Sequence, residues 1–405
     1  MNFDDTPAEA AFRSEVRTWL EANAEPKRHT RDFVGDGLPP AERLAAARAW
    51  QAKKAAAGYA AVTWPREFGG LGATVLQQLI VRQEESRFRS TFGIFEIGLG
   101  MCLPTLMAYG SEAHKASRIR PGLYGQEIWC QMFSEPAAGS DVAGVLTRAR
   151  RDGDGDEWIV NGQKVWTTGA QFSDYGLLLA RTDPTLPKHA GLTMFFVDMK
   201  SAGIEVRPIR QMAGESEFNE VFFTDLRVPD HQRLGAVGAG WKVALTTLMH
   251  ERLSVGAEIG LLNFDALWSV VQDAGQLQNP LAIEQLAQAW VAEEGLRLHQ
   301  CRTLTAMSRG GVPGPEQSIA KLVKATLAQR MANFAIELQG EAGQLGCDDP
   351  TSSGQAVERA WAWSAAMRIA GGTDEILRNI IAERVLGLPE EARQDKGIPF
   401  NEVPR

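Results

Sequence analysis

The stretch "EWIVNGQKVWTT", Glu157 to Thr168, mixes β-branched and aromatic residues in the way that is typical of β-strands. Its Asn161–Gly162 pair is a common two-residue hairpin turn, so we predict a turn there. Four runs of similar character follow, and turn residues separate them: "DYGLLLART", "LTMFFVDM", "IEVRPI" and "EVFFTDLRVP". The sequence therefore predicts a β domain between about residues 127 and 234.

The sequence on either side of this region follows the spacing of helices. Apolar residues recur every three or four positions in "AAFRSEVRTWLEAN" before it and in "LAIEQLAQAWVAEEGLRLHQ" after it. A chain of 405 residues is also too long for one ordinary core. We therefore predict an N-terminal helical domain at residues 1–125, a β domain at 126–235 and a C-terminal helical domain at 236–405.

The composition is that of a soluble globular protein, and it argues against several functions. The chain has 42 Lys and Arg against 50 Asp and Glu, a net charge of -8, so nucleic acid is not an expected partner. Its four cysteines form no C-x-x-C pair and its six histidines show no ligand spacing, so we expect no metal site. We find no signal pattern and no apolar run near the roughly 20 residues of a bilayer crossing, so we expect a cytoplasmic protein without a membrane span.

The stretch "TLMHERLSVG", residues 247–256, places Glu251 inside an apolar helical pattern. We expect this acid on or beside the core-facing side of its helix, because apolar residues surround it at helical spacing: Leu245, Leu248, Met249, Val255 and Ile259. One interpretation is an ion pair, since buried carboxylates are usually paired. The other is a catalytic base. The local pattern leaves both open.

Several motifs in a fixed order resemble the acyl-CoA dehydrogenase family. They are "FSEPAAGSD" within residues 128–149, "NGQKVWTTG" within 160–182, "HERLSVG", and the C-terminal "GGTDEILRNIIAERVLG". The resemblance implies a mixed α+β fold with an N-terminal helical domain, a central β-barrel-like domain and a C-terminal four-helix bundle. It also implies an oxidoreductase that uses FAD as its cofactor.

The resemblance assigns roles to individual residues around the flavin. A flavin is a flat ring with a polar edge, so it needs a wall to lie against and fixed donors along that edge. By resemblance, Trp166 covers one face of the ring, Thr168 approaches its reactive nitrogen, and Ser140 lies between flavin and acyl-CoA. The other expected cofactor contacts are Gln131, Phe133, Ser134, Gly340, Thr373 and Glu375.

The implied reaction removes hydrogen from Cα and Cβ of an acyl-CoA to leave a trans-2-enoyl-CoA, with electrons passed to an electron-transfer flavoprotein or a similar acceptor. It requires a positioned, desolvated base for the Cα proton. Many family members carry that glutamate near the C-terminus, where this chain has Gly371. Another branch carries it on a bundle helix within E-R, which here is Glu251–Arg252. Glu251 is therefore the expected base, and Arg252 and Gly372 are expected substrate contacts.

Two segments depart from the family pattern. The family's R-x-x-F-G segment, whose Arg contacts the flavin pyrophosphate across a subunit interface, falls near residues 268–280, where this chain has no Arg. A glycine-rich stretch reads "LQGEAGQ", with Glu341 in place of a glycine. Similar losses occur in bacterial acyl-CoA dehydrogenases of the pimeloyl and steroid side-chain type. We therefore expect either a homo-oligomer, dimer or tetramer, or a hetero-oligomer with a homologous subunit that completes the FAD site; an acyl-CoA oxidase is a lesser alternative.

Overall fold

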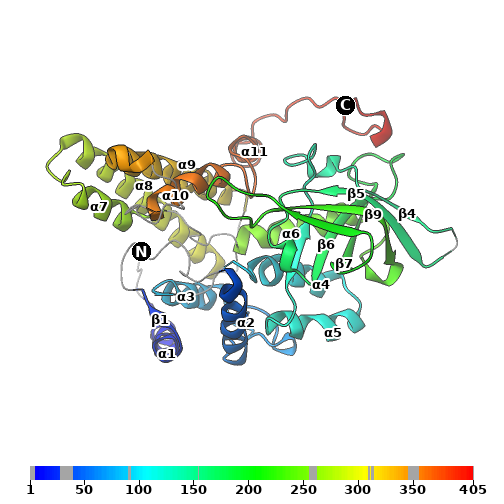
Figure 1. Cartoon of the computed structure of the whole chain (residues 1–405), viewed down its shortest axis with the longest axis horizontal. Helices are drawn as coiled ribbons and strands as arrows, with labels where there is room; N and C mark the ends of the chain where they lie inside the picture. The colour runs from blue at the N-terminus through cyan, green and yellow to red at the C-terminus, as the bar shows by residue number, and fades with distance from the viewer. Residues whose placement is uncertain are drawn as a thin grey trace.

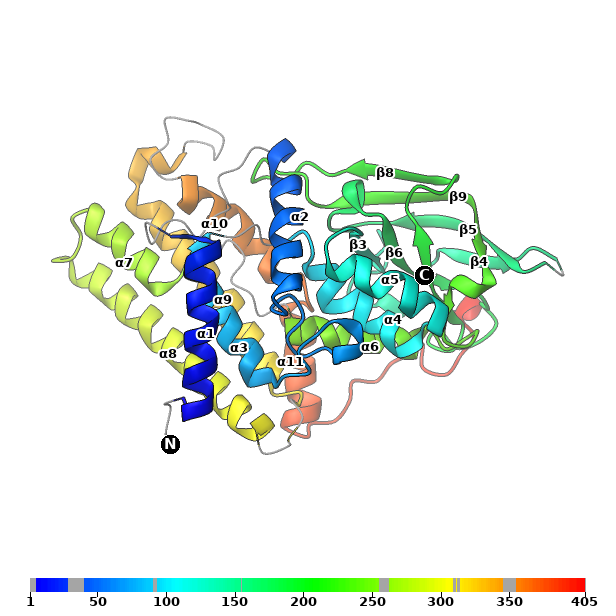
Figure 2. The ribbon, with the colours of Figure 1, turned by 90° about the horizontal axis from the view of Figure 1, so that it is seen from below.

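The computed structural model describes residues 5–27, 40–89, 93–153, 155–254, 262–308, 311, 314–344 and 355–404. Helices come first along the chain, a β-sheet follows, and helices return after it (Figure 1). The sheet lies toward one end of the molecule and the C-terminal helices toward the other (Figure 2). The predicted fold class, with helical, β and helical domains in this order, is confirmed.

The N-terminal part consists of helices and one short ribbon. The helices are α1 (Pro7–Asn23), α2 (Pro40–Ala56), α3 (Val75–Glu85), α4 (Leu103–Tyr109) and α5 (Glu112–Leu123). Reciprocal hydrogen bonds between Thr6 and Glu9 form a capping box that begins α1. The ribbon pairs β1 (Glu25–Pro26) with β2 (Phe88–Arg89). A π-helix at Gly98–Cys102 leads directly into α4.

The central part is an eight-stranded sheet with the order β10-β7-β6-β4-β5-β9-β8, and β3 pairs with β6. Most neighbours are antiparallel, but β6 is parallel to both β3 and β4. The strands are β3 (Trp129–Met132), β4 (Arg148–Arg151), β5 (Glu157–Lys164), β6 (Tyr175–Arg181), β7 (Leu192–Asp198), β8 (Ile204–Pro208), β9 (Asn219–Pro229) and β10 (Arg233–Leu234).

Both faces of the central strands are buried. On one face, Leu177 and Phe196 of β6 and β7 share a core with residues of α4 and α5. On the other face, Phe195 of β7 meets Trp158 of β5 with ring centroids 5.5 Å apart, in a core that also holds Val221 of β9. Because strands from opposite halves of one sheet meet in a single core, the sheet curls around that core as a barrel-like sheet does.

Four C-terminal helices share one apolar core, which includes Val271, Leu286, Met331 and Val357. They are α7 (Phe264–Asp273), α8 (Pro280–Ser308), α9 (Gln317–Leu338) and α10 (Gln355–Met367). A further helix, α6 (Gly240–Ser254), instead packs against the sheet and the N-terminal helices. After α11 (Asp374–Ile380), the chain returns to the β domain, as the red trace in Figure 1 shows.

The hairpin turn predicted at Asn161–Gly162 is wrong. Both residues lie inside β5, where the register with β9 shifts between Val160 and Gly162. The shift is a β-bulge whose extra residue lies in β9, where Asp225 has φ 48°, and Gly162 of β5 adopts φ 153° opposite it. A Cβ at this position would stand 2.4 Å from Oγ1 of Thr147. A close approach between strands, rather than a chain reversal, therefore explains the glycine.

We predict that Gly162→Ala lowers the free energy of unfolding by about 1–3 kcal/mol, because the added methyl group has no room beside Thr147. Denaturant unfolding followed by circular dichroism measures the change. The matched control is Gly295→Ala in α8, where no atom lies within 4 Å of the added Cβ and alanine favours the helix. Equal stability of the two variants would contradict this account of the bulge.

Candidate active site

Two segments of the β domain bring together five of the residues predicted at the cofactor. Gln131 lies on β3, Phe133 and Ser134 follow that strand, and Trp166 and Thr168 follow β5. The amide of the residue before Trp166 donates to the carbonyl of Ser134 at 2.9 Å, so the two segments run side by side. Residues predicted from separate motifs are therefore neighbours in the fold.

Trp166 has an unusual backbone and an exposed ring. Its φ is 60°, and its side chain is 57% exposed. Phe218 meets the ring edge-on, with centroids 5.8 Å apart and an interplanar angle of 90°. A left-handed backbone is uncommon for a bulky residue and costs on the order of 1–3 kcal/mol. A strained position that holds a large apolar ring toward solvent is typical of a ligand-binding residue.

Backbone amides beside this ring are available to a ligand. The amides of residues 165, 167 and 169 all donate to carbonyl groups of the protein. The intervening amides of Trp166 and Thr168, and the amide of Ser134, have no acceptor among the residues that the structure describes. A flat ring with acceptors along one edge satisfies these donors while it stacks on an exposed aromatic face. The residues present therefore fit a flavin.

A buried ion pair holds the two segments in place. The ammonium of Lys164 donates to Oε1 of Glu135 at 2.8 Å and to the carbonyl of Phe133 at 2.9 Å. Glu135 also accepts the amides of Leu146 and Thr147. Burial lowers the pKa of Lys164 to about 8 against the opposing charge of Glu135. Burial alone would raise the pKa of Glu135, but Lys164 and these hydrogen bonds lower it overall, so both groups are charged at pH 7.

The sequence prediction missed this pair, although a signal was present. Trp158, Val160 and Lys164 share the same alternation along β5, and all three are buried. A lysine on the inward side of a strand requires a buried acidic partner. Glu135, within the quoted "FSEPAAGSD" motif, supplies it.

Ser140 lies on the loop that Glu135 begins. Its side chain is exposed, and it has no hydrogen-bond partner among the described residues. The adjacent Asp141 pairs with Lys188 at 2.8 Å. Ser140 is therefore placed where a ligand can reach it.

The predicted base, Glu251, and its neighbour Arg252 lie in α6, but their side chains fall outside the described residues. Our prediction of the buried face of α6 is wrong in part, because Leu245 is 44% exposed and Met249 is 59% exposed. The buried stripe is instead formed by Val243, Ala244 and Thr247. Position 251 follows Thr247 by four residues along the same helix.

The remaining predicted residues lie in the C-terminal helical domain. Gly340 is exposed at the end of α9, with φ 56°. Thr373 caps α11 by accepting the amide of Ile376, and the carbonyl of Gly372 accepts from Lys321 at 2.6 Å. The side chain of Glu375 is 77% exposed. Among the described residues, no hydrogen bond or ion pair ties these four to the group around Trp166.

A helix of the C-terminal domain supports the aromatic wall from behind. Phe218, which contacts Trp166, also meets Trp363 of α10 at a centroid distance of 5.8 Å. Nε1 of Trp363 donates to Glu215 at 2.9 Å, and Arg359 pairs with the same carboxylate at 2.8 Å. The wall therefore depends on contacts between two domains.

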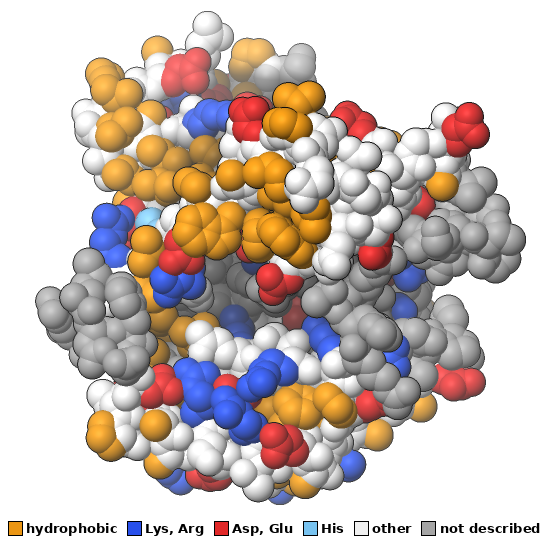
Figure 3. Space-filling view, turned by 90° about the vertical axis from the view of Figure 1, so that its left-hand side faces the viewer, with side chains coloured by type: hydrophobic (Ala, Val, Ile, Leu, Met, Phe, Trp, Pro, Cys, Tyr) orange, Lys and Arg blue, Asp and Glu red, His pale blue; other side chains and the backbone are white. Residues whose placement is uncertain are grey.

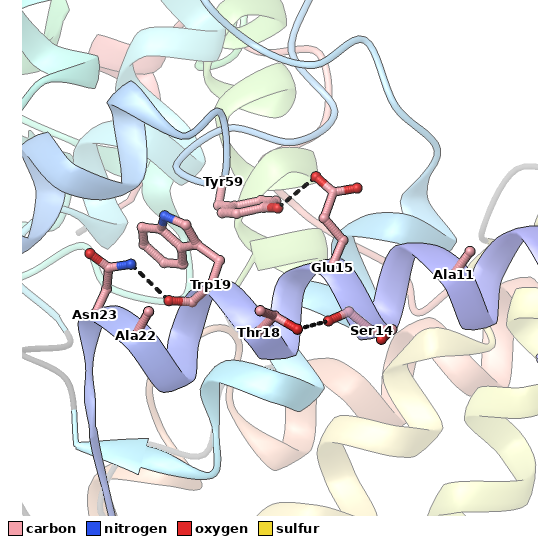
Figure 4. Close-up of a pocket in the computed structure, with 8 residues that line it drawn as sticks. All are labelled: Ala11, Ser14, Glu15, Thr18, Trp19, Ala22, Asn23 and Tyr59. Atoms are coloured by element: carbon pink, nitrogen blue, oxygen red, sulfur yellow. Dashed lines mark hydrogen bonds between the residues drawn. The ribbon is translucent and has the colours of Figure 1, made fainter.

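A groove elsewhere on the molecule contains none of the predicted site residues. A shallow groove of about 670 Å³ runs along α1, where Trp19, Tyr59 and Glu15 are among its lining (Figure 4). No group of His, Cys, Asp or Glu side chains within the described ranges could hold a metal ion. None of the helices described here combines the length and apolar character of a bilayer crossing.

The fold and this site define a flavin-dependent oxidoreductase, and the comparisons name its family. The chain belongs to the acyl-CoA dehydrogenase family. The N-terminal domain of that family matches residues 6–125, the middle domain matches 130–226 and the C-terminal domain matches 238–386. The family is FAD-dependent, so FAD is the cofactor.

Relatives cover nearly the whole chain. Acyl-CoA dehydrogenase IpdE1 of Mycobacterium tuberculosis (strain ATCC 25618 / H37Rv) is 36% identical over 387 residues, which is 94% of this chain and 98% of IpdE1. The solved steroid ACAD Tcur3481-Tcur3483 superposes with a TM-score of 0.80 at 26% identity, covering 96% of this chain and 100% of that one. The ChsE4-ChsE5 complex from Mycobacterium tuberculosis gives 0.77 at 28% identity, with coverage of 96% and 100%.

We predict that Trp166→Ala lowers flavin occupancy or shifts the flavin absorbance bands, because the apolar wall is lost while the strand scaffold remains. The ratio of flavin to protein absorbance measures occupancy, and thermal melting reports on the fold. Trp166→Gly separates two effects, since glycine adopts φ 60° without strain and yet lacks the ring. Full occupancy with an unaltered spectrum in both variants would contradict the placement of Trp166.

Proposed function

We propose that this protein oxidises an acyl-CoA thioester to a trans-2-enoyl-CoA with FAD and passes the electrons to an external acceptor, an electron-transfer flavoprotein or a similar protein. The observation that carries the proposal is the exposed ring of Trp166 beside the free amides of Ser134 and Thr168. The match of all three domains to the family supports it. When bound, FAD accepts the hydride from Cβ of the substrate.

Glu251 is the proposed base for the Cα proton. It lies on α6 four residues after Thr247, which forms a buried hydrogen bond with Thr105 at 2.9 Å. α6 also packs against the π-helix Gly98–Cys102, and such irregular turns frequently occur at functional sites. A carboxylate shielded from water has a raised pKa and gains basicity toward the weakly acidic Cα–H. Arg252 and Gly372 are the proposed substrate contacts beside it.

Ser140 is the proposed contact between the cofactor and the pantetheine part of the substrate. Its exposed side chain lies on the loop that starts at Glu135, the partner of Lys164, and this loop follows Phe133 and Ser134 in sequence. Gln131, Phe133, Ser134, Trp166 and Thr168 are the proposed ring contacts. Gly340, Thr373 and Glu375 are the proposed contacts of the C-terminal domain with FAD.

Assembly with a second chain completes the proposal. The C-terminal helices expose large apolar side chains, which is typical of a surface that is covered in an oligomer: Trp268, Leu281, Trp290, Val291 and Trp361. Hydrophobic side chains gather in a band on this side of the molecule, above a hollow (Figure 3). The missing Arg at residues 268–280 favours a homologous partner that supplies the pyrophosphate contact. Two similar solved proteins, ChsE4-ChsE5 and Tcur3481-Tcur3483, each carry two subunit names.

We predict that Glu251→Gln retains FAD and acyl-CoA binding but slows flavin reduction by about 10²–10⁴-fold, because the amide cannot accept the Cα proton. Stopped-flow bleaching of the flavin measures the rate across acyl-CoAs of varied length, branching and ring content. The matched control is Glu284→Gln, an exposed carboxylate on α8, which should bleach at the normal rate.

A structural ion pair at Glu251 gives a different result. Loss of one partner of a buried pair costs roughly 3–5 kcal/mol, so the variant would melt earlier while its folded fraction still reduced its flavin at the normal rate. That combination would remove Glu251 from the mechanism. Peroxide formation in place of electron transfer to an artificial acceptor would instead identify an acyl-CoA oxidase.

We predict that FAD stoichiometry separates the two assemblies. The chain purified alone should hold substoichiometric FAD if a homologous subunit completes the site, and co-expression with that subunit should restore one bound flavin per completed site. The absorbance ratio and the mass measured by light scattering report both quantities. Full FAD occupancy in a homo-oligomer that is bleached by an acyl-CoA would exclude the heteromeric assembly.

A further inference from the structure

We propose that the C-terminal segment, residues 395–403, positions the loop that carries Ser140, and that it acts through Lys188 and Arg181. The proposal deepens the proposed function and rests on it, because Ser140 is there the contact with acyl-CoA. The match to the family ends at residue 386, so this segment lies beyond the matched domains.

The segment docks on the β domain by backbone and side-chain contacts. It reaches the connection between β6 and β7, where Pro399 forms a bridge with Pro187. The amide of Phe400 donates to the carbonyl of Leu186, and the amide of Asn401 donates to that of Pro184, each at 3.0 Å. The Phe400 side chain is only 6% exposed. The segment therefore adds an ordered layer to the connection that bears Lys188.

Lys188 links this layer to the loop of Ser140. Its ammonium pairs with Asp141, next to Ser140, at 2.8 Å and also pairs with Asp395 of the C-terminal segment. The Lys188 side chain is 8% exposed, whereas that of Asp141 is 58% exposed. A buried ammonium retains its position only while its charge is matched. Asp395 supplies the more shielded of its two partners.

Arg181 makes a second link in parallel. Its guanidinium is buried and donates to the carbonyls of Ala143 and Val145, in the same loop, and to that of Lys188. Phe400 stacks against it, with the guanidinium carbon 3.4 Å from the ring centroid. The aromatic ring therefore covers the cation and excludes water from its hydrogen bonds. Through Lys188 and Arg181, the C-terminal segment therefore holds residues 141–145 in place.

The loop has a different support at its base. Glu135 accepts hydrogen bonds from the amides of Leu146 and Thr147, and it pairs with Lys164 of β5, so this support comes from the sheet. The links from the C-terminal segment through Lys188 and Arg181 instead reach Asp141, Ala143 and Val145. Its removal should therefore loosen residues 139–145 and leave the flavin segment around Trp166 in place.

The test uses the full-length chain with Asp395→Ala and Phe400→Ala combined. We expect the KM for acyl-CoA to rise roughly tenfold, equivalent to about 1.4 kcal/mol, with kcat changed less than about twofold and flavin occupancy unchanged. Amide hydrogen exchange should accelerate in residues 139–145 and stay constant around residues 164–168. The matched control is Lys396→Ala, which removes an exposed ion pair between this segment and Glu390. It should alter neither the KM for acyl-CoA nor the hydrogen exchange of residues 139–145.

Each other result overturns the proposal. Unchanged exchange in residues 139–145 shows that the segment does not hold the loop, and faster exchange with an unchanged KM shows that the loop position does not matter to acyl-CoA. Faster exchange across the whole β domain with loss of flavin shows a general role in stability. The exchange measurement needs no substrate, so an absence of bleaching by acyl-CoAs in the wild type counts against the proposed function separately.

Discussion

The buried pair of Lys164 and Glu135 is the constraint on which the site depends. Two charges removed from water cost several kcal/mol each unless both are matched by charge and by hydrogen bonds. Here Lys164 has the carboxylate and the Phe133 carbonyl, while Glu135 has two loop amides in addition. These bonds tie the segment 133–135, the strand end at Lys164 and residues 146–147 to one buried pair. The ion pair therefore selects a geometry, even where its net contribution to stability is small.

That geometry explains why the strain at Trp166 can persist. Trp166 follows Lys164 by two residues, and the amides on either side of it are fixed to Ser134 and Asn219. A strained backbone survives where its surroundings determine it from several directions. The ring and the free amides thus lie just beyond two strand ends, on backbone that hydrogen bonds fix to neighbouring segments, which favours accurate placement of a bound cofactor.

The sequence predicted the order of the three parts because helix and strand periodicities are local properties. It was less successful where distant segments decide the outcome. Asn161–Gly162 has the local signature of a turn, but the pair lies inside β5, opposite a β-bulge of β9 and in close contact with Thr147. The spacing of apolar residues in α6 predicted that Leu245 and Met249 are buried, whereas both are exposed in the single chain. Periodicity identifies an apolar face and does not identify what covers it.

The same limit applies to the candidate site. The motifs assigned Trp166 and Ser134 to one cofactor, and their two segments lie side by side in the fold. The cofactor contacts themselves stay a prediction, which rests on family resemblance. Lys164 could have been found from strand alternation, as it shares the inward side with Trp158 and Val160. The contacts of Glu215 with α10, and those of Phe400 with Arg181, join residues far apart along the chain. No local pattern marks such pairs.

The row of rings formed by Trp166, Phe218 and Trp363 has a consequence for how this protein can be recombined. Its last member belongs to α10 in the C-terminal domain, far along the chain from the first, and is held by Glu215 of the β domain. A chimera that joined this β domain to the helical domain of a relative would keep every strand contact, but it would keep the row of rings only with an aromatic residue at the place of Trp363. The matched domains are therefore not interchangeable modules, and substitutions on either side of this boundary should accumulate together.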